Sequence, residues 1–188
     1  MANADLLIYL FYCIIFSVHK GEKMDPRNGR PAQVILALAF GCRKSGAGLS
    51  NHALGIALNI SHKMHPNLPI MVQSEFIPPM KGDWVPEIVV GIHQVPGKYL
   101  DTREVLAQMA SVCLENDLRC AIIIAHPDHQ WRVVRAARKL GFESIVPSLV
   151  ELDVPYDPES VQWWTRNRFL FWIRETPVIA YYWIRGWI

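Results

Sequence analysis

The chain has 188 residues, of which 51% are hydrophobic and 19% are charged, and its formal net charge at pH 7 is +2. This length predicts one compact domain with an appended segment, and such a chain can bury a core without disulfides or metals. The near-balanced charge argues against a dedicated nucleic-acid binder, which usually carries a concentrated basic patch. Four scattered cysteines form no CxxC pair, so neither a disulfide framework nor a zinc ribbon is expected.

The N-terminal segment is defined as residues 1–31, and it contains an apolar run over residues 6–18 with one polar residue, Ser17. The run is shorter than the roughly 20 residues that a membrane-spanning helix needs, so both a short signal anchor and a structural strand or helix fit it. If the run inserted, the cations that follow at positions 19–23 would keep the next domain in the cytoplasm. Met24, which precedes a polar linker, is a hypothetical alternative start.

The remaining residues, 32–188, are interpreted as a single domain in which strands and helices alternate. Apolar runs that predict strands lie at residues 34–40, 69–74, 87–92, 120–125 and 144–147, and helical patterns follow near residues 49, 103 and 129. Short, wholly apolar strands separated by helices are typical of parallel sheets covered on both faces. The pattern therefore predicts a Rossmann-like, doubly wound α/β fold with a mostly parallel sheet of about five strands.

Helix boundaries are predicted from capping residues. Ser50 or Asn51 is expected to cap the first helix, and Thr102 the second. The third predicted helix runs from His129 to Leu140 and ends at Gly141, since glycine is favoured just after a helix.

The C-terminal part is rich in aromatic and basic side chains. Residues 163–188 contain five of the seven tryptophans and four arginines, and a charged pair and Pro177 interrupt the apolar residues. One interpretation is a final helix or two that cover the core, and the other is an amphipathic surface that meets lipid headgroups. The first is favoured because terminal amphipathic helices usually pack on their own domain.

Candidate functional residues are sought where the predicted strands end, because ligands of open α/β sheets bind at that edge. The loop after the first strand offers Gly41, Arg43 and Lys44, a combination that suits an anion. It matches neither GxGxxG nor the phosphate loop GxxxxGK[ST], so no nucleotide is identified, and a flexible turn explains the loop equally well.

The second candidate group begins a helix after the third predicted strand and consists of Asp101, Thr102, Arg103 and Glu104. Asp101 and Thr102 suit a helix cap, and a carboxylate at Glu104 favours the helix dipole, so structure alone explains them. In the functional interpretation Arg103 holds an anion, Asp101 and Thr102 contribute to the ligand site, and Glu104 or Asp101 orients a histidine or a water.

The third group follows the most apolar strand and contains His126, His129 and Arg132. Either histidine suits acid–base chemistry, and Arg132 would bind an anion from the same side of the helix as His129. A spacing of three residues between histidines is weak evidence for a metal site, so none is predicted. Two buried, structurally satisfied histidines are the alternative interpretation.

The order of these motifs resembles the SanA/ElyC/YdcF-like family, small bacterial domains linked to the cell envelope. The resemblance covers roughly residues 32–188, and its motifs are a strand closing on glycine, a Thr-x-Glu segment that starts a helix, and a strand followed by a histidine and an x-x-Arg helix. In this sequence they are residues 34–41, 101–104 and 122–132, together with the terminal segments 173–175 and 181–187. The resemblance implies a Rossmann-like fold and a role in envelope or peptidoglycan physiology.

Three functions follow as expectations. The first is an enzyme that handles a phosphate-bearing or nucleotide-like small ligand, with His129 or His126 as acid and base. The second is a non-catalytic sensor of a nucleotide-like or adenosyl ligand, for which fold analogy makes S-adenosylmethionine a candidate. The third is an envelope scaffold whose N- or C-terminal segment contacts the membrane. The cofactor is left open, and the expected location is the cell envelope or the cytoplasmic membrane, with which the chain would be associated, otherwise the cytoplasm.

Overall fold

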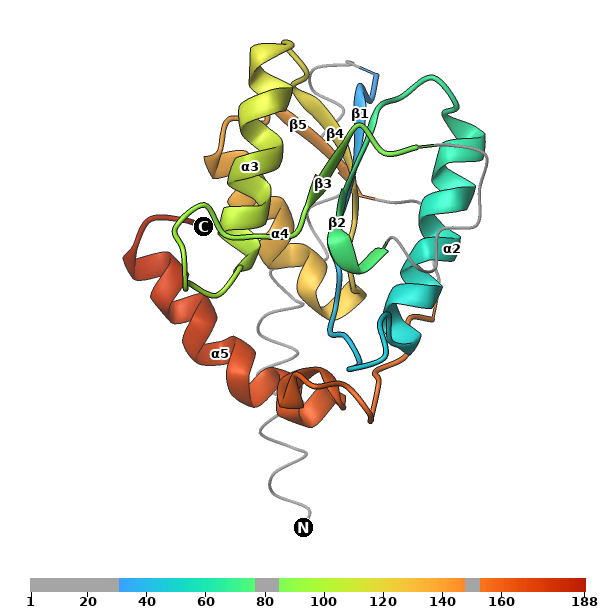
Figure 1. Ribbon diagram of the computed structural model, residues 1–188. Coiled ribbons are helices and arrows are strands. Elements are labelled where there is room, and N and C mark those ends of the chain that lie inside the picture. Colours follow the sequence, from blue (N-terminus) through green and yellow to red (C-terminus); the bar gives the residue numbers. More distant parts are fainter. Residues whose placement is uncertain (1–30, 77–84, 148–152) are drawn as a thin grey trace.

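The computed structural model describes residues 31–76, 85–147 and 153–188 (Figure 1). Its strands form one parallel sheet in the order β3-β2-β1-β4-β5. The strand bounds are β1 Val34–Ala37, β2 Ile70–Gln73, β3 Ile88–Val90, β4 Cys120–Ile124 and β5 Ser144–Pro147. A mixed α/β domain with a parallel sheet, as the sequence predicts, is therefore confirmed.

The centre of the sheet is buried on both of its faces. Every residue of β1 and β4 is buried, and the two strands pair in register with Ile35 opposite Ile122. Since side chains alternate along a strand, Val34 and Leu36 enter one core and Ile35 and Ala37 enter the other. This explains why the strands read as unbroken apolar runs rather than as alternating ones.

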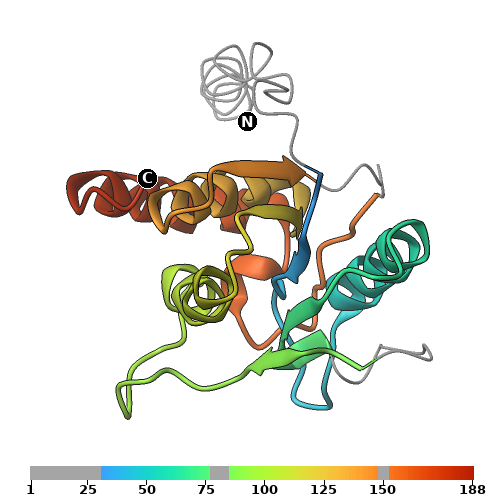
Figure 2. The same ribbon diagram turned by 90° about the horizontal axis from the view of Figure 1, so that it is seen from above.

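Helices cover both faces of the sheet. In Figure 2, α2 (Leu49–Met64) lies on one side, and α3 (Thr102–Glu115) and α4 (Pro127–Lys139) lie on the other. Leu54 and Leu58 of α2 belong to the core that contains Ile35, whereas Met109 of α3 and Val133 of α4 belong to the core that contains Leu36. The helices lie where the sequence predicts them, but three positions of the apolar pattern that predicts the first helix, Leu49, Ile56 and Ile60, are exposed. The side of α2 that packs on the sheet carries Leu54, Ala57 and Leu58 instead.

Two of the predicted helix starts are late by one to three residues. Helix α2 begins at Leu49 after Gly48, and its Leu49 N–H is bound by Asp157 rather than by Ser50 or Asn51. Helix α3 is capped by Asp101, whose carboxylate accepts the Glu104 N–H at 3.0 Å, and Thr102 is already its first helical residue. In each case a better-placed carboxylate supplies the acceptor.

The third helix begins earlier than predicted and ends as predicted. Helix α4 starts at Pro127 rather than His129, because the His126 side chain accepts the Asp128 N–H and proline suits the first turn of a helix. Gly141, with φ of +104°, follows the end of the helix in the left-handed conformation that glycine adopts readily.

The C-terminal segment crosses the end of the sheet from one core to the other. It begins with the short 3-10 helix η3 (Trp163–Thr165), which leads into α5 (Arg168–Ile184); a second short 3-10 helix, η2 (Ser74–Phe76), directly follows β2. In α5, Phe171 belongs to the core beside α2, and Tyr182 belongs to the core beside α3 and α4. The C-terminal helix therefore covers the core, in agreement with the favoured interpretation.

The membrane interpretation of residues 6–18 and the alternative start at Met24 fall outside the described residues. Within residues 31–76, 85–147 and 153–188, no helix combines the length and the hydropathy that crossing a membrane requires.

A buried carboxylate fastens the loop after β1 to the C-terminal segment. The Asp157 side chain is 1% exposed and accepts two hydrogen bonds of 2.8 Å from the Arg43 guanidinium. It also accepts the backbone N–H groups of Leu49 and Glu159. The hydrogen bond from Arg43 is the main reason that the pKa of Asp157 lies below its usual range. The Arg43 guanidinium is therefore bound in a structural contact between the loop after β1 and the segment that precedes α5.

We predict that Asp157→Ala lowers the free energy of unfolding by about 1–3 kcal/mol, because the Arg43 guanidinium and the part-buried Leu49 N–H lose their acceptor. Urea unfolding followed by circular dichroism measures the loss. Glu159→Gln is the matched control: it also removes a carboxylate from Arg43, but that side chain is 72% exposed. Exposed ion pairs contribute little, so the control should lose less than about 1 kcal/mol. Equal losses for the two variants would contradict this account of the loop.

Candidate functional site

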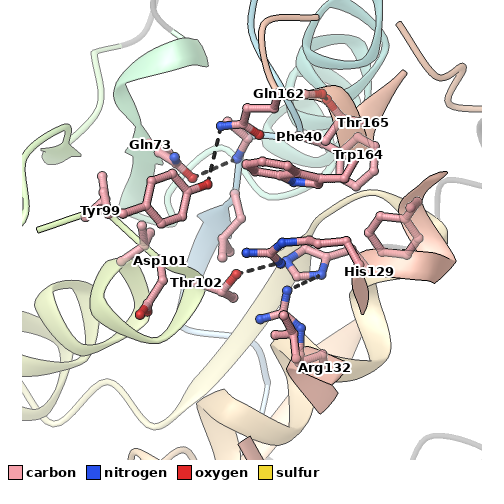
Figure 3. Close-up of a pocket in the computed structure, with 18 of the residues that line it drawn as sticks. Phe40, Gln73, Tyr99, Asp101, Thr102, His129, Arg132, Gln162, Trp164 and Thr165 are labelled. Carbon is pink, nitrogen blue, oxygen red and sulfur yellow. Dashed lines mark hydrogen bonds between the residues drawn. The ribbon is translucent and has the colours of Figure 1, made fainter. Parts of the chain in front are cut away.

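A pocket of about 220 Å³ lies at the carboxyl ends of β1 and β2. It is lined by residues 38–41 after β1, Gln73 of β2, Glu75 of η2 and the first residues of α3 with the loop before them. The rest of the lining comes from α4, η3 with the residue before it, and α5. Figure 3 shows side chains from these elements converging on one space. The site therefore forms where the sheet topology leads one to look for ligands, and the C-terminal helix encloses it.

His129 is one of the titratable side chains that line this pocket. Its Nε2 lies 3.1 Å from the Thr102 hydroxyl, and its Nδ1 lies 3.5 Å from Oε1 of Glu175 and 3.3 Å from the Arg132 guanidinium (Figure 3). Burial, and then the charge of Arg132, lower the pKa of His129. The imidazole is consequently neutral at pH 7, with one nitrogen to donate a proton and one to accept.

Glu175 and Arg132 form a buried ion pair behind His129. The Arg132 Nε and Nη2 atoms donate to the two carboxylate oxygens at 2.6 and 3.1 Å, and the side chains are 4% and 1% exposed. Burial by itself would raise the pKa of Glu175, but the hydrogen bond with His129 and the charge of Arg132 outweigh it and lower the pKa to about 2. The carboxylate is thus ionised, which fixes the position of both neighbours.

The start of α3 lines the pocket together with α4. Thr102 presents its hydroxyl to His129, while Asp101 accepts hydrogen bonds from the Glu104 N–H and from the Tyr182 hydroxyl at 3.3 Å. The Tyr182 hydroxyl also accepts the Arg103 N–H. Tyr182 thereby joins α5 to the first turn of α3, and burial raises its pKa to about 12, so this phenol stays protonated.

The backbone after β1 is held in place by amide side chains. Gln73 accepts the Ala39 N–H at 3.2 Å, and Asn51 accepts the Phe40 N–H and donates to the Gly41 carbonyl. Gly41 has φ of +72°, and a Cβ there would collide with the Thr165 hydroxyl. Only glycine therefore fits the turn that brings this backbone to the edge of the pocket.

Aromatic side chains and one partly exposed arginine form the rim of the pocket. The Tyr99 and Trp164 rings meet edge to face at 6.3 Å, and Gln162 donates to the Tyr99 hydroxyl at 3.4 Å (Figure 3). The Arg174 guanidinium lies 4.8 Å from the centre of the Trp164 ring. Such a rim offers flat apolar surfaces beside a positive charge.

The structure brings five of the ten sequence-predicted site residues together at the pocket: Gly41, Asp101, Thr102, His129 and Arg132. The other five lie outside its lining. Arg43 is bound by Asp157, Lys44 is exposed, and the Arg103 guanidinium stacks on Trp187 at 4.4 Å.

Glu104 and His126 also have structural partners. Glu104 accepts hydrogen bonds from the Gln94 N–H and from Gln108, and it does not contact His129. His126 stacks on Phe40 with a ring separation of 3.9 Å, and burial is the main reason that its pKa is lowered to about 4. His126 is therefore an uncharged core residue that caps α4.

Sequence reasoning missed several residues of the site, of which Glu175 matters most. The sequence predicts that Asp101 or Glu104 orients the histidine, but Glu175, 43 positions after Arg132, does so. Gln73, Tyr99, Trp164 and Arg174 were missed as well, although the tryptophan and arginine content of the C-terminal segment was a signal that the segment has a role.

No arrangement of three or more histidine, cysteine, aspartate or glutamate side chains suited to a metal ion occurs among the residues that the structure describes. Comparisons of the chain with protein-family models, with curated proteins and with solved structures found no match. The site is therefore interpreted from its own geometry.

We predict that His126 makes the fold sensitive to acid. The unfolded chain takes up a proton at this residue below pH 6.5, whereas the folded chain does so only near pH 4. Stability is therefore complete above pH 6.5 and falls between pH 6.5 and pH 4, by up to about 3 kcal/mol. In His126→Asn, which keeps a helix-capping side chain, this slope should become shallower.

Urea unfolding at a series of pH values measures the slope. His52→Asn, at an exposed histidine of α2, is the control and should keep the wild-type slope. His129 contributes to acid sensitivity in the same direction, so part of the slope should persist in His126→Asn. An unchanged slope in that variant would refute the assignment.

We further predict that Arg132 and Glu175 are strongly coupled. Glu175→Met leaves the Arg132 charge buried without its partner and should cost about 3–5 kcal/mol of unfolding free energy. The double variant Arg132→Met/Glu175→Met should cost less than Glu175→Met alone, because no charge then remains buried. A double-mutant cycle in urea measures the coupling, and additive losses would show that the pair is independent.

Proposed function

We propose that this chain is a SanA/ElyC/YdcF-like domain of cell-envelope physiology whose pocket binds a small phosphate-bearing or nucleotide-like ligand, with His129 as its acid–base group. The observation that carries the proposal is the position of His129. A neutral imidazole in the pocket touches a hydroxyl through one nitrogen and a buried carboxylate–guanidinium pair through the other. Such a setting is common for histidines that transfer protons.

The topology supports the finer description of the fold as Rossmann-like and doubly wound. From β1 the chain passes outward to β2 and β3 on one side, and β4 and β5 lie on the other side of β1. Connections therefore leave β1 and β4 in opposite directions, and a crevice is expected at their carboxyl ends. The pocket draws on residues after both strands, namely Ala39 and Phe40 after β1 and His129 after β4.

The lining favours a ligand with a flat ring and an anionic group. Arg174 lines the pocket with a side chain that is 25% exposed, and its guanidinium lies 3.8 Å from Glu175, whereas Arg132 is buried and bound to both Glu175 oxygens at 2.6 and 3.1 Å. The first turn of α3 adds the positive end of a helix dipole beside Thr102. Tyr99 and Trp164 offer faces on which a base or a sugar ring packs. In this proposal Arg174 binds the anion and the aromatic rim holds the ring.

The ionised Glu175 assigns a direction to proton transfer. If Nδ1 of His129 donates toward Glu175, its Nε2 is left as an acceptor that faces Thr102. It would then take a proton from the Thr102 hydroxyl, or from a ligand hydroxyl or water in its place. The Arg132–Glu175 pair would hold the imidazole and stabilise its protonated form. Thr102 and Asp101 would act by positioning the start of α3.

A non-catalytic binding domain is the second candidate, and a specific observation favours it. Thr102, His129, Arg132 and Glu175 are hydrogen-bonded to one another, as in networks that simply complete a core. In that case the pocket would hold a nucleotide-like or adenosyl ligand without changing it.

We predict that a member of a panel of nucleoside monophosphates, sugar phosphates, S-adenosylmethionine and inorganic phosphate stabilises the full chain against heat. A ligand at one hundred times its dissociation constant should add about 2.7 kcal/mol. Arg174→Gln should abolish most of this stabilisation. Arg119→Gln, at the opposite end of β4, is the matched control and should retain it. The absence of stabilisation by every compound, or its persistence in Arg174→Gln, would refute the proposed ligand class.

Turnover distinguishes the two candidates. A stabilising phosphate compound is incubated with the wild-type chain and with His129→Asn, and ³¹P nuclear magnetic resonance follows its signals. Acid–base catalysis predicts conversion that drops by about 10²–10⁴-fold in His129→Asn while ligand binding persists. A ligand that binds and stays unchanged in the wild type would support the sensor instead.

A further inference from the structure

The outward side of α5 is largely apolar, with Thr176 as a polar residue in its middle. Phe169, Ile173, Trp183 and Ile184 are 54%, 50%, 72% and 78% exposed. Their spacing of four, ten and one residues, together with exposed Pro177 and Ala180 between them, places them on one side of a helix with 3.6 residues per turn. From Phe169 to Ile184 this apolar face extends about 23 Å at 1.5 Å per residue. We call these residues the α5 outer face.

The exposure of the α5 outer face does not come from a detached helix. On the opposite side, Phe171, Glu175 and Tyr182 are 2%, 1% and 3% exposed. Glu175 holds Arg132, and Tyr182 contacts the start of α3. Helix α5 is therefore anchored by its inner side, and it lies at the periphery of the described elements (Figure 1). A face of this size on a firmly packed helix is typical of a contact surface.

The segment that carries the α5 outer face shows positive charges to solvent, and one of its arginines, Arg168, pairs with Asp128 of α4 at 2.9 Å. Residues 160–188 contain the arginines at 166, 168, 174 and 185, and their single acidic residue is Glu175. Because Glu175 is buried in the ion pair with Arg132, the charge that this segment shows to solvent is positive. Arg166, Arg168 and Arg185 are exposed. The face is thus a strip of aliphatic and aromatic side chains bordered by guanidinium groups.

We propose that the α5 outer face lies flat on an anionic lipid surface. Aromatic and aliphatic side chains on one side of a helix, with arginines along its border, match the boundary between acyl chains and lipid phosphates. A second copy of the chain fits less well, because pairing two such faces would bring the bordering arginines of both copies together. The proposal is independent of the ligand of the pocket.

Vesicle sedimentation of the full chain tests this proposal. The chain should sediment with phosphatidylcholine vesicles that contain phosphatidylglycerol, and less with phosphatidylcholine alone or at high salt. Trp183→Ser/Ile184→Ser should weaken binding at least about tenfold, since it removes the two most exposed apolar side chains of the face. Ile92→Ser is the matched control: Ile92 is 82% exposed after β3, away from α5. It should bind as the wild type does.

A second measurement reports on α5 itself, so that vesicle binding by residues 1–30 is not mistaken for binding by the helix. Brominated lipids quench tryptophan emission at short range. A large part of the quenching should be lost in Trp183→Phe and kept in Trp131→Phe, a substitution on α4. Quenching that is unchanged in Trp183→Phe, a wild-type chain that does not sediment, or a soluble dimer that Trp183→Ser/Ile184→Ser dissociates would each overturn the proposal.

Discussion

The site depends on the burial of a charged pair, Arg132 with Glu175. Removing two charges from water is costly, and the cost is recovered only when geometry and further hydrogen bonds are favourable. Here both carboxylate oxygens are bound by one guanidinium, which also lies 4.8 Å from the centre of the Tyr182 ring. Arg132 belongs to α4 and Glu175 belongs to α5, so the pair fixes the C-terminal helix against the helix that follows β4. The same pair sets the electrostatic environment of His129.

A second ion pair, outside the lining of the pocket, also connects distant parts of the chain. Arg43 and Asp157 join the loop after β1 to the segment that precedes α5. Both pairs link the early or middle part of the chain to its last 35 or so residues, whose aromatic side chains then close the pocket. The C-terminal segment is consequently as much a part of the site as the strand ends are. Without the C-terminal segment, the sheet and helices α2 to α4 would leave His129 open to solvent on one side.

The sequence allowed the strands, the helices and the general place of the site to be predicted, because these follow from local patterns. The apolar runs at residues 34–40 and 120–125 contain β1 and β4, and the group around His129 does follow a buried strand. Pairing between distant charges has no local pattern. Arg43 and Arg132 were both predicted to bind an anion, yet their partners lie 114 and 43 positions further on.

The capping error at α2 has the same origin. A side chain is recognised as a cap from its own neighbours in sequence, and Asp157 competes for the start of α2 from a position 108 residues later. Nothing in the sequence around Glu175 distinguishes it from a solvent-exposed glutamate of a helix, and only the structure shows that it is buried. Acidic residues near helix starts, such as Asp101, were correctly recognised as capping residues because that interaction is local.

The two sides of helix α5 have different surroundings. Its inner side supplies Arg174 and Tyr181 to the pocket and Glu175 to the ion pair, and its outer side carries exposed apolar residues. A rigid helix transmits a small displacement from one side to the other, so a contact that shifts α5 alters the pocket wall. Thermodynamic linkage then works in both directions. If a contact at the outer side strengthens ligand binding in the pocket by a given free energy, the bound ligand strengthens that contact by the same free energy.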